Sequence, residues 1–251
     1  MALIITSTSN ERAKRLRVLK AKAGRRESGL HLIEGERLVF DAVSSGAEIV
    51  YALVSEGRED IAERLTGSGI GFDYASENVM RSVCDTETPQ GVCAAVNTPD
   101  TEPPALYPAG LIVALDRLQD PGNLGTILRT ADAFGAAGLL VGSGCTDPFS
   151  PKALRAAMGS TYHIPVWQGE LAAELPRLKL AGADLICGHL NGSEELPPLS
   201  GNRVLVIGNE GAGVSDEVAS LCTLYRLPMR GRAESLNAAV AASILIYKLS
   251  E

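Results

Sequence analysis

The sequence lacks long apolar runs. Its longest stretch without Asp, Glu, Lys or Arg has 14 of the 251 residues, whereas a membrane-spanning helix needs about 18 or more apolar residues. Near the start, the charged residues follow a very short apolar stretch, whereas a secretory signal places its charges before a long one. We therefore expect a cytoplasmic protein with no membrane partner.

The common metal-binding and phosphate-cradling motifs are also missing. The five cysteines are odd in number and form no CxxC pair, so neither a disulfide framework nor a zinc knuckle is indicated. The three histidines, His31, His163 and His189, are isolated in the sequence. No glycine-rich turn is followed by Gly-Lys-Ser/Thr, which a P-loop requires. We expect no metal site.

Positive charge is concentrated at the start of the chain. The net charge of −7 argues against a polyanionic partner, but residues 1–26 hold eight basic residues and one acidic residue. Such an asymmetry is typical of a phosphate-binding element, although a solvated helix face would also account for it. The eight basic residues are Arg12, Lys14, Arg15, Arg17, Lys20, Lys22, Arg25 and Arg26.

A proline-rich segment divides the chain. Residues 97–110 contain four prolines, each of which removes a backbone donor and fixes φ. We interpret this segment as a linker between a domain at 1–96 and a domain at 111–251. The first domain is predicted to be a small α/β domain, with helices at 10–22, 36–46 and 61–65 and strands at 31–35, 48–56 and 91–97.

The second domain alternates regularly between strands and helices. Apolar runs predict strands at 111–116, 138–142, 163–167, 184–190, 203–210 and 223–229. Amphipathic or small-residue segments predict helices at 123–136, 151–160, 169–182, 215–222 and 235–250. Strands without polar alternation, separated by helices, indicate an α/β fold with a parallel sheet covered on both faces.

Three clusters follow strands of this sheet, at the edge where open α/β sheets bind ligands. In the first cluster, Asn123 can cap a helix and Arg129 lies about 120° further around it, where it interrupts the apolar side. The second is the glycine-rich turn that begins at Gly208. The third begins after 227–229 (Leu-Pro-Met) and ends in 235–237 (Ser-Leu-Asn), where Ser235 could be a simple N-cap. Taken alone, Arg129 could also be an arginine that reaches the surface.

In this order, the three clusters resemble the SpoU/TrmH family of RNA 2′-O-ribose methyltransferases, within the SPOUT superfamily. The motifs are D-P-x-N-x-G with an Arg six residues after the Asn, then I-G-x-E-x-x-G, then L-P-M and S-L-N. The resemblance covers residues 111–251. More loosely, residues 1–96 resemble the substrate-binding domain often fused to such enzymes, which is similar to the ribosomal protein L30e fold and binds structured RNA.

The resemblance implies a deep trefoil knot, S-adenosylmethionine as the cofactor and a homodimer formed through the catalytic domain. The substrate class would be ribosomal RNA, with 23S favoured, or transfer RNA. Carried over from the family, the catalytic residues are Arg129, Asn123, Glu210, Ser235 and Asn237. The resemblance implies that Arg129 is the base and that Asn123 orients it. It also implies that Glu210 helps to fix Asn123 or the cofactor loop, and that Ser235 and Asn237 complete the polar surroundings. The cofactor-binding residues are Gly208, Leu227, Leu236, Ile207, Met229 and Gly188. The basic residues at the start of the chain would bind RNA phosphates.

Two other interpretations remain open from the sequence. One is a non-catalytic RNA-binding or ribosome-assembly module on the same fold, against which the presence of Asn123, Arg129 and Glu210 counts. The other is an unrelated nucleotide-binding α/β enzyme, which the missing phosphate cradle disfavours.

Overall fold

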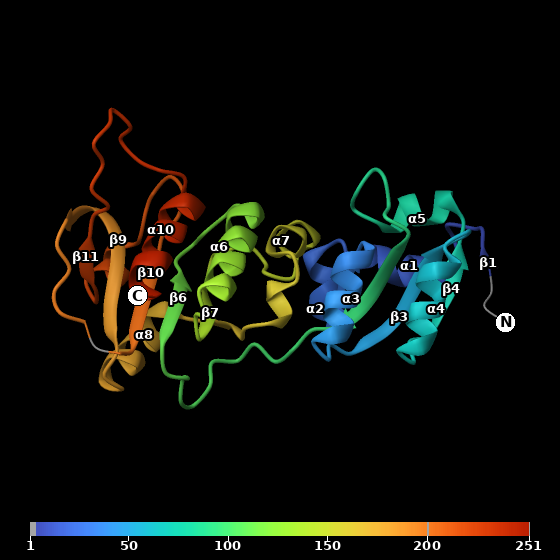
Figure 1. The fold of residues 1–251 in the computed structure, drawn as a ribbon, viewed down its shortest axis with the longest axis horizontal. Helices are drawn as coiled ribbons and strands as arrows, with labels where there is room; N and C mark the ends of the chain where they lie inside the picture. Colours follow the sequence, from blue (N-terminus) through green and yellow to red (C-terminus); the bar gives the residue numbers. More distant parts are fainter. Residues whose placement is uncertain (1–3, 200, 251) are drawn as a thin grey trace. The chain divides into compact units, whose positions relative to one another are not determined.

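The computed structural model describes residues 4–199 and 201–250, which form two compact units (Figure 1). The first unit runs to Pro99 and also includes Phe149–Arg155, and the second unit holds the rest of the chain. The division predicted at residues 97–110 did not foresee that Phe149–Arg155 groups with the first unit. No helix in the described ranges is long and apolar enough to cross a membrane.

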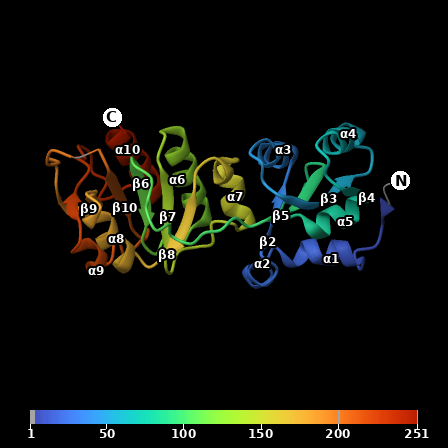
Figure 2. The same cartoon turned by 90° about the horizontal axis from the view of Figure 1, so that it is seen from below.

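The first unit contains a mixed five-stranded sheet in the order β1-β4-β3-β5-β2. α1 and α5 pack on one face of this sheet, where their buried leucines, valines and methionine meet the strands; α3 and α4 lie on the other face (Figure 2). The strands are β1 (Ile4–Ile5), β2 (Leu30–Glu34), β3 (Ile49–Ser55), β4 (Phe72–Ala75) and β5 (Val92–Asn97). The helices are α1 (Glu11–Val18), α2 (Lys22–Ser28), α3 (Glu36–Ser44), α4 (Glu59–Gly67) and α5 (Glu77–Val83).

The helix predicted at 10–22 is wrong as a single element. It ends at Val18, and the chain turns before α2 begins. A Cβ added at Gly24 would lie 2.2 Å from the Val18 carbonyl oxygen, so only glycine permits this close return. The Arg25 guanidinium secures the turn by donating to the carbonyl oxygens of Leu19 and Lys20, each at 2.8 Å. The short elements β1, β4 and α5 were not predicted, because two to seven residues carry little periodicity.

The second unit contains a six-stranded sheet in which every pair of neighbouring strands is parallel, in the order β11-β9-β10-β6-β7-β8. The predicted α/β fold with a parallel sheet is confirmed. The strands are β6 (Leu111–Leu115), β7 (Gly138–Gly142), β8 (Val166–Gly169), β9 (Asp184–Ser193), β10 (Arg203–Ile207) and β11 (Thr223–Tyr225).

Helices cover both faces of this second sheet (Figure 2). α6 and α10 pack together on one face, and α8 and α9 bury their leucines and valines against the other. The helices of this unit are α6 (Pro121–Ala133), α8 (Leu171–Leu180), α9 (Asp216–Ala219) and α10 (Ala238–Ser250), with a 3₁₀ turn at Ser160–Tyr162. α7 (Pro151–Ala157) begins within the segment Phe149–Arg155, which groups with the first unit.

Two predicted helix caps are wrong by two or three residues. α6 begins at Pro121, and the Asp120 carboxylate accepts the Asn123 N–H at 2.9 Å, so Asp120 is the cap. At the start of α10, Asn237 rather than Ser235 accepts the Ala239 N–H, at 2.9 Å. In both places the residue whose side chain reaches the free N–H groups of the first turn decides where the helix starts.

The proline-rich segment forms no regular element between residues 98 and 110, but it packs on the second unit. The Thr101 carbonyl accepts the Gln168 N–H at 2.7 Å. The Tyr107 ring meets Trp167 edge-on at 5.1 Å, and its hydroxyl donates to Glu174 at 2.9 Å. The segment is therefore a strap along this unit rather than a free linker.

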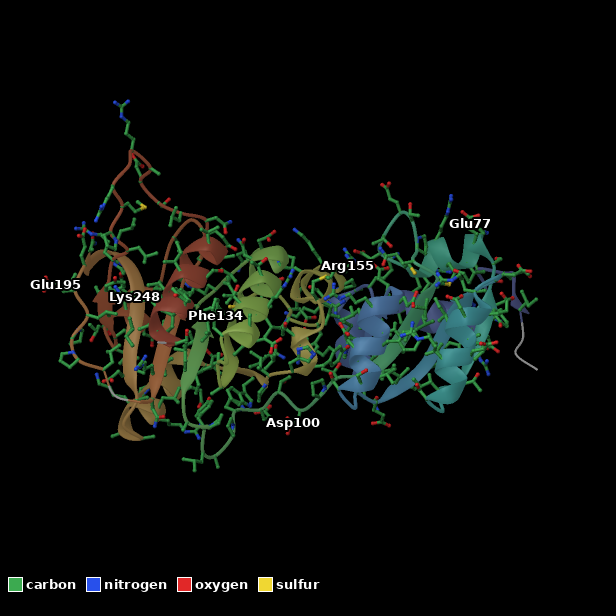
Figure 3. All side chains as sticks on the ribbon, in the orientation of Figure 1. Glu77, Asp100, Phe134, Arg155, Glu195 and Lys248 are labelled. Carbon is green, nitrogen blue, oxygen red and sulfur yellow. The ribbon has the colours of Figure 1, made fainter. Side chains whose placement is uncertain are left out.

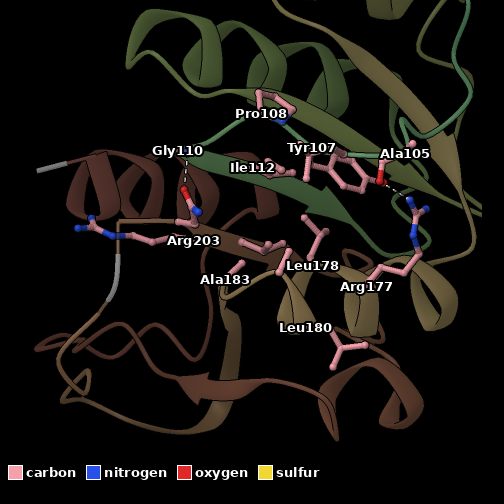
Figure 4. Close-up of a pocket in the computed structure, with 14 residues that line it drawn as sticks. Ala105, Tyr107, Pro108, Gly110, Ile112, Arg177, Leu178, Leu180, Ala183 and Arg203 are labelled. Atoms are coloured by element: carbon pink, nitrogen blue, oxygen red, sulfur yellow. Dashed lines mark hydrogen bonds between the residues drawn. The ribbon is translucent and has the colours of Figure 1, made fainter.

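The strap, α8 and the start of β10 line an open pocket of about 260 Å³ (Figure 4). Its lining includes Ile112, Arg203 and Val204, at the amino ends of β6 and β10. Open parallel sheets bind their ligands at the opposite, carboxyl edge. This pocket is therefore separate from the three predicted clusters.

Candidate active site

Three connections meet at the carboxyl edge of the parallel sheet. They follow β6, β10 and β11 and lead into α6, α9 and α10 respectively. The last of them, residues 226–237, extends beyond the end of β11 before α10 begins (Figure 1). Because the strands are parallel, the polar residues that follow them are gathered at one edge.

Glu210 joins these connections. Its Oε1 accepts hydrogen bonds from the Asn123 side-chain amide and from the Asp120 N–H, both at 3.0 Å. Its Oε2 accepts the Gln119 N–H at 3.1 Å. The Asn123 Oδ1 in turn accepts a hydrogen bond from the Asn237 side-chain amide at 3.1 Å. A carboxylate can only accept at neutral pH, so it fixes the orientation of the Asn123 amide.

The environment of Glu210 favours its charged form. Burial raises the pKa of the Glu210 carboxyl, but the hydrogen bonds from the Asn123 amide and from the N–H groups of Asp120 and Gln119 outweigh this effect. The pKa of Glu210 therefore lies below its ordinary value of 4.5. At neutral pH the network is held by a full negative charge.

The turn after β10 explains the glycines of the second cluster. Asn209 and Gly213 exchange both backbone hydrogen bonds, at 3.0 and 2.9 Å. A Cβ on Gly208 would lie 2.2 Å from the Gly213 carbonyl carbon, so no larger residue fits there. The Asn209 side chain accepts the N–H groups of Gly211 and Ala212, each at 2.9 Å. This tight turn places Glu210 opposite the connection that follows β6.

Arg129 lies on the exposed face of α6, whereas Leu124, Ile127 and Leu128 face the sheet. The expectation that Arg129 interrupts the sheet-facing side is wrong. Its guanidinium forms no hydrogen bond or ion pair within residues 4–199 and 201–250. The resemblance implied that Asn123 orients Arg129, but the Asn123 side chain binds Glu210 and Asn237 instead.

Of the five residues carried over as catalytic, the structure joins three, namely Asn123, Glu210 and Asn237. Ser235 is exposed in the connection before α10 and forms no hydrogen bond with another described residue. Sequence reasoning missed Gln119 and Asp120 as partners of Glu210. The Asp-Pro pair at 120–121 was the available signal for a helix cap at Asp120.

The residues predicted to hold the cofactor lie on or just beyond β9, β10 and β11. Ile207 ends β10, Gly208 follows it, and Gly188 directly follows the last β9 residue that pairs with β10. Leu227, Met229 and Leu236 belong to the connection between β11 and α10.

This connection has the features of a nucleoside-binding surface. Between Leu227 and Leu236, the backbone forms no hydrogen bond with the rest of the described chain. Met229 and Leu236 expose more than a third of their surface. Free backbone donors and acceptors beside exposed apolar side chains suit the edges and faces of an adenine ring. The residues present therefore fit S-adenosylmethionine.

The basic residues at the start of the chain belong to α1, α2 and the turn between them. Arg25 is buried, so its predicted contact with phosphate is wrong. Four others have partners within the unit. Arg12 binds Asp73, Lys14 binds Glu11, Arg17 donates to the Thr8 carbonyl and to Ser82, and Lys20 donates to the Cys84 carbonyl. Arg15, Lys22 and Arg26 are exposed and form no hydrogen bond with described residues.

No group of three or more His, Cys, Asp or Glu side chains in the described ranges could hold a metal ion. All five cysteines are free thiols.

Comparisons with known proteins agree with this geometry. Residues 110–247 match the model of the SpoU rRNA Methylase family, and residues 10–94 match the MRM3-like substrate binding domain. The chain is 39% identical to the 23S rRNA (guanosine(2553)-2′-O)-methyltransferase RlmP of Bacillus subtilis, over 98% of both chains.

Solved structures lead to the same family. An AdoMet-bound rRNA methyltransferase from Sinorhizobium meliloti aligns with a TM-score of 0.87 and 34% identity, over 99% of this chain and 97% of that chain. The SpoU methyltransferase AviRb from Streptomyces viridochromogenes, in complex with AdoMet, aligns with a TM-score of 0.84 and 28% identity, over 96% and 97%. This chain therefore belongs to the SpoU rRNA Methylase family and is an S-adenosylmethionine-dependent RNA 2′-O-methyltransferase.

Proposed function

We propose that the RNA methylated by this protein is 23S ribosomal RNA, at a ribose 2′-hydroxyl. The proposed chemistry rests on the hydrogen-bonded series Glu210–Asn123–Asn237 at the carboxyl edge of the sheet, with the unpaired Arg129 on the same helix as Asn123. The similarity of nearly the whole chain to a relative named for 23S rRNA favours that substrate over transfer RNA. We place the enzyme in the cytoplasm, where it would meet this RNA.

A ribose hydroxyl is a weak nucleophile at neutral pH, so the site must position it and stabilise the charge that develops on its oxygen. When bound, S-adenosylmethionine supplies a methyl group that a nucleophile can take from the sulfonium sulfur. Asn123 and Asn237, oriented by Glu210, hold the start of α6 against the start of α10. Arg129 binds the phosphate next to the target ribose and stabilises the developing alkoxide.

The resemblance assigns Arg129 the role of a base, but a guanidinium keeps its protons in proteins. The proton of the 2′-hydroxyl therefore passes to the neighbouring phosphate or to water, and Arg129 acts through its charge. Ser235 lies two residues before Asn237 on the connection that carries the cofactor-binding residues. We assign it to the polar surroundings of the ribose.

We also propose that the second unit contains a deep trefoil knot. β11 lies at the sheet edge beside β9, yet the next element, α10, packs on α6 and contacts β10 and β6 nearer the middle of the sheet. The chain therefore crosses back over the carboxyl edge between β11 and α10. This path supports threading of the last connection through the preceding ones.

A homodimer formed through the catalytic domain is supported by an apolar strip on α10. Val240, Ile244 and Tyr247 follow helical spacing and are each 44% to 53% exposed. Phe134, which directly follows α6 and is labelled in Figure 3, extends the strip, because the centroid of its ring lies 5.3 Å from that of the Tyr247 ring. A second copy of this chain would remove these side chains from water.

For the first unit we propose an L30e-like domain that binds structured RNA. The match to a substrate binding domain over residues 10–94 supports this role. Accordingly, residues 1–96 would bind substrate, 97–110 would connect the domains, and 111–251 would carry the methyltransferase site. In the first unit, Arg15, Lys22 and Arg26 are the predicted cations that remain available to RNA phosphates.

Replacing Arg129 tests the function directly. With labelled cofactor and unmodified 23S, 16S and transfer RNA as separate substrates, the wild type should label 23S RNA. Arg129→Ala and Arg129→Lys should each reduce kcat about 100-fold or more, because lysine cannot form the two-pronged contact, while the cofactor Kd stays within about twofold. Arg81→Ala, an exposed arginine on α5, is the control and should keep full activity. Label only in transfer RNA would reassign the substrate, and label in none would contradict the proposal.

Glu210→Gln tests whether the network depends on a charge. The pKa of Glu210 is depressed in the folded protein, so its contribution to stability is complete above about pH 4.5 and is lost as the pH falls through the folded pKa. The Tm of the variant should be about 2–4 °C lower at pH 7, and the difference should shrink below pH 4.5. Glu217→Gln on α9 is the control. A difference that stays constant between pH 7 and pH 3 would argue against a charged network.

A double substitution tests the RNA-binding role of α2. Lys22→Ala with Arg26→Ala should raise the KM for RNA about tenfold. A plot of the logarithm of the RNA association constant against the logarithm of the salt concentration should become shallower by about 1.4–1.8, because two phosphate contacts are lost. The cofactor Kd should not change. Arg37→Ala with Arg81→Ala removes the same charge from other exposed helices of this unit. Equal effects of both pairs on the KM would refute a specific phosphate contact at α2.

A further inference from the structure

Arg117 has an unfavourable backbone conformation at the edge that carries the active site. Its φ is 55°, and within the described ranges only Met158, at 51°, is another non-glycine residue with positive φ. The left-handed region costs a residue with a Cβ free energy that glycine does not pay. Arg117 follows β6 and lies two residues before Gln119, whose N–H binds Glu210.

The fold secures this conformation without using the arginine side chain. The Arg117 carbonyl accepts hydrogen bonds from Asn209 Nδ2 at 2.9 Å and from Gln119 Nε2 at 3.2 Å. A glycine would keep both bonds and would relieve the strain. The backbone thus gives no reason for an arginine here, and strained residues of this kind gather at functional sites.

Contacts hold the Arg117 side chain at its Cγ and Nε, but its two terminal nitrogens have no partner in the described chain. Its stem lies over Gly144, where an added Cβ would come within 3.2 Å of the Arg117 Cγ. Its Nε lies 3.4 Å from an oxygen of the buried Asp116 carboxylate, whose other oxygen accepts the Ser215 N–H at 2.6 Å. The two Nη groups form no hydrogen bond with the described chain, and the side chain is 45% exposed.

A guanidinium held at its Nε side presents the paired N–H groups that match two oxygens of a phosphate. We propose that Arg117 binds a phosphate of the RNA strand beside the methylated ribose, and that the strained backbone serves to aim its side chain at that phosphate. The inference rests on the proposed function, because it takes RNA as the ligand at this edge.

The competing explanation is that Arg117 only neutralises Asp116. In that case, its removal would lower stability and leave RNA affinity unchanged. One explanation predicts weaker RNA binding and the other predicts lower stability, so one set of variants separates them. Arg117→Gly removes the side chain and the strain together, and Arg117→Lys keeps a positive charge without the paired donors.

The test measures the Kd of the full-length protein for a 23S rRNA transcript by filter binding at several salt concentrations, with the cofactor Kd and the Tm in parallel. Arg117→Gly should raise the RNA Kd about tenfold. The dependence of the logarithm of the RNA affinity on the logarithm of the salt concentration should become shallower by about 0.7–0.9, because one phosphate contact is lost. Its cofactor Kd should stay within about twofold and its Tm should not fall. Arg117→Lys should recover part of the affinity. Lys179→Ala, an exposed cation on α8, is the matched control and should bind RNA as the wild type does.

An RNA Kd for Arg117→Gly within about twofold of the wild type, or a fall in its Tm with a parallel rise in the cofactor Kd, would overturn the inference. Methyl transfer by the wild type to the same transcript separates this result from the proposed function. Transfer without an Arg117 effect would refute only the inference. An Arg117 effect without transfer would refute the proposed function and the placement beside a methylated ribose, and would leave only a contact between Arg117 and an RNA phosphate.

Discussion

The active site depends on one carboxylate that ties together three connections of a parallel sheet. Glu210 accepts two backbone N–H groups from the connection after β6 and the side-chain amide of Asn123, which binds Asn237 at the start of α10. These residues are separated by up to 114 positions in the sequence, and no covalent link holds them together. Because a charged acceptor strengthens each bond, the site is organised before any ligand arrives.

In the first unit, most of the basic side chains near the start of the chain are paired with other groups of the same unit. Five of the eight basic residues near the start have partners inside the unit, and Arg25 is buried where it completes the turn between α1 and α2. A count of charges in the sequence therefore overstates the phosphate-binding surface. What remains, at Arg15, Lys22 and Arg26, is a small exposed set on a chain whose net charge is −7. Additional cations near the catalytic edge, such as Arg129 and Arg117, fit this need for positive charge.

The parallel sheet could be predicted from the sequence because each strand is a short, uniformly apolar run between helices. The site motifs could be recognised because they keep a fixed order along the chain. Other features depend on contacts that spacing does not encode. The break after Val18 needs Gly24 to approach a distant carbonyl, and the caps at Asp120 and Asn237 depend on which side chain reaches the free N–H groups. By contrast, helical spacing does encode the exposed side of Arg129, which lies about 140° around the axis from Leu124, whereas the other buried apolar residues of the helix lie within about 60° of Leu124.

The central claim is that this edge of the sheet methylates a ribose rather than a base. The most direct measurement is tandem mass spectrometry of nucleosides from 23S rRNA that has been incubated with the protein and S-adenosylmethionine. The account predicts one nucleoside whose added methyl group stays with the sugar when the glycosidic bond breaks, leaving an unmodified base. A methyl group that stays with the base would contradict it.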